Sequence, residues 1–140
     1  MKDNNVFIDT NILVYSILED ENHLPKTKKA IFLLKNLDDK NVFISTQVLS
    51  ELYSSLLKHK FNDKDIQKKL DFIMQEMIIS PITFETVKSS WDLRNKYNYS
   101  YWDSLILSSA LENDCAVLYS EDMHNFHNVE NSLKIVNPLN

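Results

Sequence analysis

Apolar residues along this chain form two kinds of pattern: short continuous runs, and longer stretches in which they recur every three or four positions. The runs at 6–8, 42–45 and 115–120 are rich in β-branched and aromatic residues, which predicts buried strands. Shorter runs at 78–80 and 133–136 predict two more strands. Because helical stretches separate the strands, the pattern indicates a three-layer α/β/α sandwich around a central, mainly parallel sheet.

Six stretches show helical spacing, the first over 11–20 and the second from Pro25 to about Leu37. The other four are expected to begin at Thr46, at Asn62 or Asp63, at Thr83 and at Ser100. Proline suits the first turn of a helix, and serine or threonine can cap the free amides at its start. The side chains expected to face the core are Ala30, Leu33, Leu34, Leu37, Val48, Leu49, Leu52, Tyr53, Leu56, Leu57, Ile66, Leu70, Ile73, Met77, Phe84, Val87, Trp91, the stem of Arg94, Ile106, Ala110 and Leu111.

The chain contains no glycine, which normally supplies the left-handed residue after a helix. Asparagine tolerates the same conformation, and five asparagines fall at predicted breaks: Asn22, Asn41, Asn62, Asn98 and Asn113. The lack of glycine also excludes phosphate-binding loops built on it, including the P-loop and the dinucleotide fingerprint.

Length and composition fit one domain spanning residues 1–140. A formal charge of −5 argues against broad, charge-driven binding to nucleic acid or membranes. Cys115 is the only cysteine, so no intramolecular disulfide can form, which fits a reducing compartment. No apolar run has the length of a signal peptide or a membrane span, and we expect a cytoplasmic protein that does not enter a membrane.

Four acidic residues lie where the predicted strands lead into the next segment. Asp9 directly follows the first strand, Asp122 lies two residues beyond the strand at 115–120, Glu51 is in the helix after the second strand, and Asp103 is in the first turn of the last helix. Ligands of open parallel sheets bind beyond the carboxyl ends of the strands. Carboxylates gathered there repel each other unless cations neutralise them, and Mg²⁺ or Mn²⁺ does this with oxygen ligands.

Each of these acids also has a purely structural interpretation. Asp9 can cap the helix that follows it, and Asp103 suits the first turn of a helix because of the helix dipole. Periodicity places Glu51 almost opposite the apolar arc of its helix, on the solvent face, unless that face borders a cleft. Asp122 can be a turn residue, and Glu121 beside it is an alternative for the same role.

The four acidic segments together resemble the PIN-domain ribonucleases, and most closely the small VapC-type toxins of toxin–antitoxin pairs. The family's hydrophobic strand into an Asp-Thr-Asn trio appears as "VFIDTNILVY", and its glutamate-bearing helix as "ISTQVLSELY". Its aromatic-Asp-Ser-Leu-Ile motif appears as "YWDSLILSSA", and its strand followed by Ser-Glu-Asp-Met as "VLYSEDM". The match covers nearly the whole chain, and it departs from the family after the last motif, where "HNFHN" replaces frequent glycines.

This resemblance implies a PIN-like fold and a Mg²⁺- or Mn²⁺-dependent endoribonuclease. Asp9, Glu51, Asp103 and Asp122 would hold one or two metal ions and activate a water for in-line attack on an RNA phosphodiester, which leaves a 5′-phosphate and a 3′-hydroxyl. Thr10, Asn11 and Ser120 would orient the carboxylates or water by hydrogen bonds. The partners implied are an RNA substrate, a cognate antitoxin whose tail fills the cleft, and a second copy of the chain in a homodimer.

Three other classes compete with this interpretation. An aspartyl-phosphate phosphatase needs a second aspartate two residues after the first, where this chain has Asn11. A non-catalytic PIN-like module that binds protein or RNA is the main alternative, although none of the four acids is missing. An acidic structural domain whose carboxylates only cap helices would show no metal-dependent change in stability.

The remaining polar and aromatic groups admit two interpretations each. The basic groups can contact phosphates or form solvated helix faces, and they comprise Lys26, Lys28, Lys29, Lys58, His59, Lys60, Lys64, Lys68, Lys69, Arg94 and Lys96. Tyr99, Tyr101 and Trp102 can stack on bases, but packing or dimer contacts are the more common role of aromatics before a core helix. His124 and His127 have a spacing found in zinc sites, yet no cysteine or further histidine lies near them in sequence.

Overall fold

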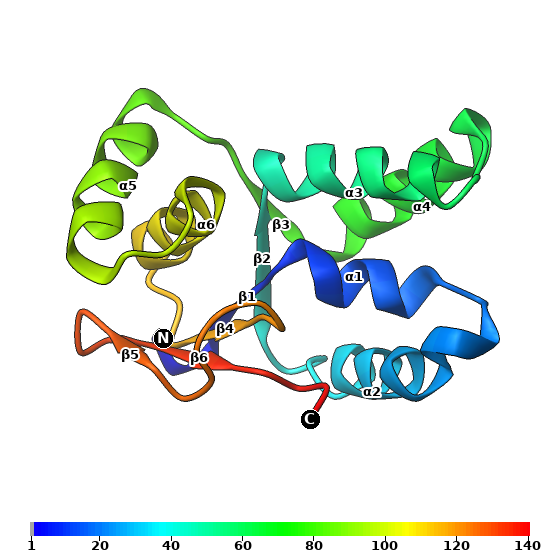
Figure 1. The fold of residues 1–140 in the computed structure, drawn as a ribbon, viewed down its shortest axis with the longest axis horizontal. Coiled ribbons are helices and arrows are strands. Elements are labelled where there is room, and N and C mark those ends of the chain that lie inside the picture. Colours follow the sequence, from blue (N-terminus) through cyan, green and yellow to red (C-terminus); the bar gives the residue numbers. More distant parts are fainter. Residues whose placement is uncertain (1) are drawn as a thin grey trace.

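A computed structural model describes residues 2–140, and its centre is a six-stranded sheet (Figure 1). The strand order is β3-β2-β1-β4-β6-β5, and all neighbours are parallel except β5 and β6. The predicted mainly parallel sheet is therefore confirmed. The strands are β1 (Asn5–Ile8), β2 (Asn41–Ser45), β3 (Ile78–Ser80), β4 (Val117–Tyr119), β5 (Asn128–Val129) and β6 (Leu133–Val136).

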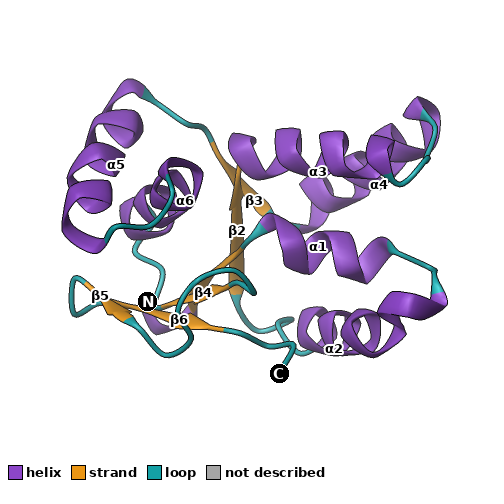
Figure 2. Cartoon of the chain, in the orientation of Figure 1, coloured by secondary structure: helices purple, strands orange, loops and turns teal. Residues whose placement is uncertain are grey.

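Helices cover both faces of this sheet, as Figure 2 shows, so the predicted three layers are also confirmed. Helices α1 to α4 lie on one face, and α5 and α6 lie on the other. The α-helices are α1 (Thr10–Ile17), α2 (Leu24–Lys35), α3 (Thr46–Lys58), α4 (Asp63–Glu76), α5 (Phe84–Tyr97) and α6 (Tyr101–Glu112), with short 3₁₀ turns η1 (Lys2–Asn4) and η2 (Glu21–His23). Within residues 2–140, no helix combines the length and apolarity needed to cross a bilayer.

The order of the strands creates a switch point between β1 and β4. From β1 the chain builds outward through β2 to β3 with α1 to α4 on one face, and then returns to β4 through α5 and α6 on the other. Ile8 pairs with Tyr119, and the Asp9 amide donates to the Tyr119 carbonyl at 2.9 Å. The chain therefore diverges to opposite faces immediately beyond these two strand ends, which opens a crevice there.

The helix starts are close to those predicted, with one correction. Ser45 caps α3 by accepting a hydrogen bond from the Val48 amide at 3.3 Å, whereas Thr46 was the predicted cap. Thr46 is instead the first helical residue, and its hydroxyl accepts a hydrogen bond from the Ile82 amide at 3.1 Å. The turn begins one residue early because the last strand residue, Ser45, already has the extended backbone that a cap requires.

The predicted caps of the last three helices are confirmed. Thr83 accepts from the Thr86 amide at 3.3 Å, and the two side chains form a reciprocal capping box. Ser100 accepts from the Asp103 amide at 3.1 Å, and Asn62 caps α4. The sequence pattern therefore located most helix starts to within a residue.

The predicted inner face of α5 is wrong. Phe84 is 73% exposed and Trp91 is 52% exposed, whereas Thr86, Ser90 and Leu93 are buried. Small polar side chains allow α5 to approach α6 closely, and the Ser108 hydroxyl donates to the Thr86 carbonyl at 2.8 Å across this contact. Arg94 and Leu57, also predicted inward, are exposed.

Of the five asparagines at predicted breaks, Asn98 alone is left-handed, with φ of 62° at the end of α5. The other four have ordinary backbone angles, and Asn62 is a helix cap. Left-handed residues among 2–140 also include Lys60, Asp114, Phe126, Glu130 and Asn131. Glu130 and Asn131 form the turn between β5 and β6, and β5, at two residues, is too short to leave a hydrophobic pattern.

Candidate functional site

Asp9 stands at the switch point, between the end of β1 and the start of α1. Its carboxylate accepts hydrogen bonds from the Thr10 amide and from the Ser120 hydroxyl, both at 2.7 Å. The side chain is 4% exposed. Asp9 therefore caps α1, as its structural interpretation predicted, and it also faces the crevice beyond β4.

Burial raises the pKa of Asp9 to about 7. The hydrogen bonds from Ser120 and Thr10 lower the pKa because they favour the charged form, and the negative charges of Asp103 and Glu51 raise it. Because the raising effects outweigh the lowering ones, the ionised form of Asp9 at neutral pH is less stable in the fold than in water. A nearby cation would remove that penalty.

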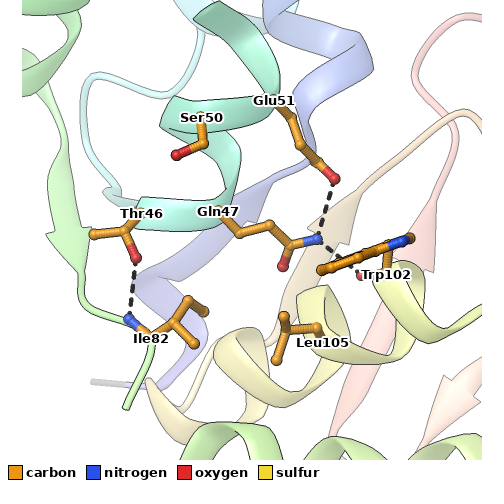
Figure 3. Close-up of a pocket in the computed structure, with 7 residues that line it drawn as sticks. All are labelled: Thr46, Gln47, Ser50, Glu51, Ile82, Trp102 and Leu105. Carbon is orange, nitrogen blue, oxygen red and sulfur yellow. Dashed lines mark hydrogen bonds between the residues drawn. The ribbon is translucent and has the colours of Figure 1, made fainter. Parts of the chain in front are cut away.

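Glu51 faces the same crevice, so the exception stated for it, a helix face that borders a cleft, is the one that holds. Its Oε1 accepts a 2.7 Å hydrogen bond from the Thr10 hydroxyl, and its Oε2 accepts a 3.2 Å hydrogen bond from the Gln47 amide. The side of α3 that carries Glu51 contacts α1 through the Thr10 hydroxyl, and it contacts the start of α6 through Gln47 and the Trp102 carbonyl, as Figure 3 shows. Periodicity alone could not reveal a polar cleft on that face.

Asp103 and Asp122 complete the set from the other side. Asp103 is half-buried in the first turn of α6, and its pKa is raised by burial first and then by the charge of Asp122. The Ser100 hydroxyl opposes this shift, and Glu51 adds to it. Asp122 is exposed on the loop after β4, and its Oδ2 accepts a 2.9 Å hydrogen bond from the Asn11 amide.

The three predicted supporting residues each contact a different carboxylate. The Thr10 hydroxyl bonds Glu51, the Asn11 amide bonds Asp122, and the Ser120 hydroxyl bonds Asp9. Asn11 also accepts from the Glu121 amide at 3.3 Å, which anchors the start of the loop after β4. These bonds tie α1, α3 and that loop together around the acids.

Glu121 occupies a different environment from its neighbour Asp122. Its Oε2 lies 2.5 Å from the Lys26 Nζ of α2 in an ion pair, and Lys26 also lies over the Tyr15 ring. The carboxylate of Glu121 is thus already neutralised by the protein, whereas Asp122 accepts only an amide among its side-chain contacts.

The four acids line one pocket of about 440 Å³, together with Glu121, the predicted alternative to Asp122. The pocket runs along α1 and α3, and the lining residues that sequence reasoning did not assign to it are Val14, Tyr15, Leu18, His23, Ser55 and His59. His59 was noted within a basic group, but no sequence signal connects Tyr15 or His23 to the acids. Gln47, which holds Glu51, was likewise missed, although it lies one helical turn before it.

The donor set fits a hard divalent cation. None of the four acids has a Lys, Arg or His partner among residues 2–140, where the ion pairs join other residues. In the same part of the chain no three His, Cys, Asp or Glu side chains are close enough to hold a metal between them. The acids therefore line one pocket without forming a closed ligand cluster, and Mg²⁺ does not need one, since it binds through one or two carboxylates and retains waters.

Several solved structures share this fold. VapBC2 from Rickettsia felis, bound to a promoter DNA fragment, is 24% identical with a TM-score of 0.70, and the match covers 95% of this chain and 99% of that one. A toxin–antitoxin complex from Klebsiella pneumoniae is 18% identical with a TM-score of 0.70, covering 95% and 97%. VapC20 from Mycobacterium tuberculosis, a toxin that cleaves the sarcin–ricin loop, is 18% identical with a TM-score of 0.65, covering 84% and 89%.

No curated protein matches the sequence significantly. The family model of the PIN domain, in contrast, matches residues 6–131, a range that contains all four acids. This match spans nearly the whole chain and agrees with the fold and the resemblance of the motifs. The chain therefore belongs to the PIN domain family.

Proposed function

We propose that this chain is a Mg²⁺- or Mn²⁺-dependent endoribonuclease and the toxin of a toxin–antitoxin pair. The observation that carries the proposal is a pocket at the β1/β4 switch point, lined by four acids that have no cationic partner within residues 2–140 and including Asp9 with its raised pKa. Family membership and the toxin neighbours support the same function. Oxygen-only ligands around a polar pocket suit phosphoryl chemistry.

In this proposal Asp9, Glu51, Asp103 and Asp122 hold the metal. Thr10, Asn11 and Ser120 orient the acids through the hydrogen bonds described above, and Gln47 holds the second oxygen of Glu51. A bound Mg²⁺ or Mn²⁺ would supply a Lewis acid that acidifies a water and neutralises the charge growing on the phosphate. Asp9 must be ionised to bind the metal, and its pKa in the metal-free fold is about 7, so protons compete with the metal and metal affinity is expected to rise with pH up to about 7.

A cognate antitoxin is the partner we propose, since two of the structural neighbours are complexes of this kind. A groove of about 740 Å³ between α1, α2 and α4 offers it a largely apolar floor that includes Ile17, Leu34 and Phe72. Lys35, Lys40, Lys68 and Lys69 rim this groove with only two acids, Asp38 and Glu76. An amphipathic segment with acidic flanks would match both features. We also propose a homodimer and a location in the cytoplasm.

Cleavage of end-labelled total RNA by the purified chain tests the catalytic proposal. Cutting is expected with Mg²⁺ or Mn²⁺, and it should disappear with EDTA and in Asp103→Asn, which keeps the side-chain volume but removes the charge. Asp39→Asn is the matched control, because Asp39 is an exposed aspartate outside the pocket. Intact RNA under every metal condition, together with no divalent-ion binding in calorimetry, would exclude the nuclease.

The second candidate is a non-catalytic PIN-like module that binds protein or RNA. The spacing of the acids favours it over other rivals, since no three of the described ligand-type side chains converge closely enough to hold a metal as they stand. Such a module would bind RNA or a protein partner with equal affinity in EDTA and in Mg²⁺. The cleavage assay separates the two candidates directly.

A further inference from the structure

Three concavities meet at Glu51 along the exposed side of α3. The acidic pocket shares Glu51 and Ser55 with a second depression of about 370 Å³, which is also lined by Ser50, Ser54 and Lys58. A third pocket, of about 430 Å³, shares Ser50 and Glu51 with the second (Figure 3). We call these three depressions together the α3 groove.

The chemistry of the α3 groove changes along its length. At one end Trp102, 60% exposed, lies with its indole beside Gln47 and is in edge-on contact with Tyr101 at 5.0 Å between centroids. Exposed serine hydroxyls follow in the middle, and Lys58 and His59 are exposed at the other end. An aromatic platform, hydroxyls and cations in sequence suit a base, a sugar–phosphate backbone and a phosphate.

Gln47 links the aromatic end to the acids and leaves one polar atom unused. Its amide nitrogen donates to the Glu51 carboxylate at 3.2 Å and to the Trp102 carbonyl at 3.0 Å. Because both partners are acceptors, the amide oxygen must point the other way, toward the Leu105 side of the pocket (Figure 3). That oxygen is buried and has no hydrogen-bond donor among the described residues. The Gln47 amide oxygen therefore has no donor among the described residues, although it lies in the same pocket as the exposed indole of Trp102.

We propose that the α3 groove binds a single-stranded RNA segment in which an unpaired base stacks on Trp102 and a phosphate lies at Lys58 and His59. The segment then crosses Glu51, so the scissile phosphate faces the acidic pocket. This inference rests on the proposed function and specifies which residues outside the acidic pocket hold its substrate. Gln47 acts as a positioning residue, since one amide fixes both the stacking platform and a proposed metal ligand.

Tryptophan fluorescence tests the stacking contact without requiring cleavage. The chain has two tryptophans, and Trp91 lies on α5, outside the described lining of the α3 groove. In Trp91→Phe the emission comes from Trp102 alone, and an unstructured oligoribonucleotide of about ten residues in EDTA is expected to quench it. In the reciprocal Trp102→Phe variant, where Trp91 reports, the same titration should leave the emission unchanged.

Affinity measurements in EDTA give the second readout. Trp102→Ala should raise the Kd for the oligoribonucleotide roughly tenfold, whereas Phe84→Ala, which removes an equally exposed aromatic on α5, should not. Lys58→Ala should reduce the salt dependence of binding, and Lys88→Ala on α5 is its control. In Mg²⁺, Trp102→Ala should raise KM more than it lowers kcat, as expected for a residue that binds substrate away from the reacting atoms.

Two results would overturn the proposal. In the first, RNA does not quench Trp102 emission and Trp102→Ala binds RNA as tightly as the wild type, while the chain still cleaves RNA. The substrate then follows another path, and only this inference fails. If Trp102→Ala converts a dimer to a monomer in sedimentation equilibrium and leaves RNA affinity unchanged, the aromatic end is a contact between copies. Failure of the proposed function looks different, because RNA then stays intact even with an unmodified groove.

Discussion

At the scale of single residues, Asp9 has two opposing effects on the stability of the fold. As a cap it stabilises the start of α1, yet burial beside two other acids raises its pKa to about 7. Hydrogen bonds from Ser120 and Thr10 offset part of that penalty without supplying positive charge. An ionised Asp9 therefore destabilises the metal-free fold, and a bound cation would offset this cost.

This cost predicts a pH dependence of the metal-free protein. The pKa of Asp9 is about 7 in the fold against 3.8 unperturbed, so between these values the folded chain retains a proton that the unfolded chain has lost. As the pH rises from about 4 to about 7, the free energy of unfolding should fall by at most about 1.4 kcal/mol per pH unit. Above pH 7 it should level off. Thermal unfolding from pH 4 to pH 9 in EDTA measures this fall.

Asp9→Asn should lose most of this slope and be the more stable protein at pH 8, because asparagine caps helices as well as aspartate does. The exposed Asp39→Asn variant is expected to follow the wild-type profile. A wild-type profile that stays flat from pH 4 to pH 8 would contradict the electrostatic account of this residue.

Metal addition should act on the same residues. At pH 8 a saturating concentration of Mn²⁺ or Mg²⁺ is expected to raise the Tm of the wild-type chain, with about 2.7 kcal/mol of stabilisation at one hundred times the Kd. Asp9→Asn and Asp103→Asn should each lose most of this shift, because each removes a charge from the pocket. If both variants show the same Tm shift as the wild-type chain, the metal binds elsewhere.

Thr10 allows the orienting role to be separated from the charge. Thr10→Val keeps the volume of the side chain but removes the 2.7 Å hydrogen bond to Glu51. We expect metal affinity or kcat to fall roughly tenfold to a hundredfold, with little change in Tm in EDTA. Thr10→Ser, which keeps the hydroxyl, should restore most of the loss, and a failure of serine to do so would point to packing instead.

At the scale of elements, the approach of α5 to α6 differs most from expectation. Large side chains at helical spacing normally face the core, but here Thr86, Ser90 and Ser108 do so, and Phe84 and Trp91 face outward. The connection between the two helices is equally tight, since Asn98 adopts a left-handed backbone and the Arg94 guanidinium donates to the Tyr99 carbonyl at 2.7 Å. This geometry sets the position of Asp103 at the start of α6.

The left-handed turn gives a prediction for stability. Asn98→Ala should lower the free energy of unfolding by about 1 kcal/mol, because a β-carbon disfavours φ of 62° and alanine lacks the local hydrogen bonds of asparagine. Asn98→Gly should be neutral or slightly stabilising, since glycine adopts this angle freely. Urea unfolding of both variants decides the point, and equal losses would indicate that the asparagine side chain itself is needed.

At the scale of the whole molecule, the acids meet because of topology. β1 and β4 are neighbours although more than one hundred residues separate Asp9 from Asp122, and α3 and α6 start near the same sheet edge on opposite faces. The apolar groove between α1, α2 and α4 lies away from the described lining of the acidic pocket. The proposed substrate site and the proposed antitoxin groove share no lining residue, so substitutions can test them separately.

Phe72, 64% exposed on α4, tests this separation. Phe72→Asp places a charge on the apolar groove and should weaken binding of the proposed antitoxin, while metal-dependent Tm shifts and RNA cleavage remain. Asp71→Ala, a neighbouring change that does not line the groove, is the control. Equal antitoxin affinity in Phe72→Asp and wild type, measured by calorimetry, would place the partner elsewhere.

The sequence by itself determined the alternation of strands and helices, most helix caps and the identity of the four acids, because these depend on local hydrogen bonding and on short motifs. It could not decide whether the side of α3 that carries Glu51 borders a cleft or which side chains join α5 to α6, since periodicity reports only where apolar atoms avoid water. Those questions were decided by tertiary structure, which brings α1, α3, α6 and the loop after β4 to one edge of the sheet. A polar cleft forms where several elements meet, so no local sequence pattern predicts it.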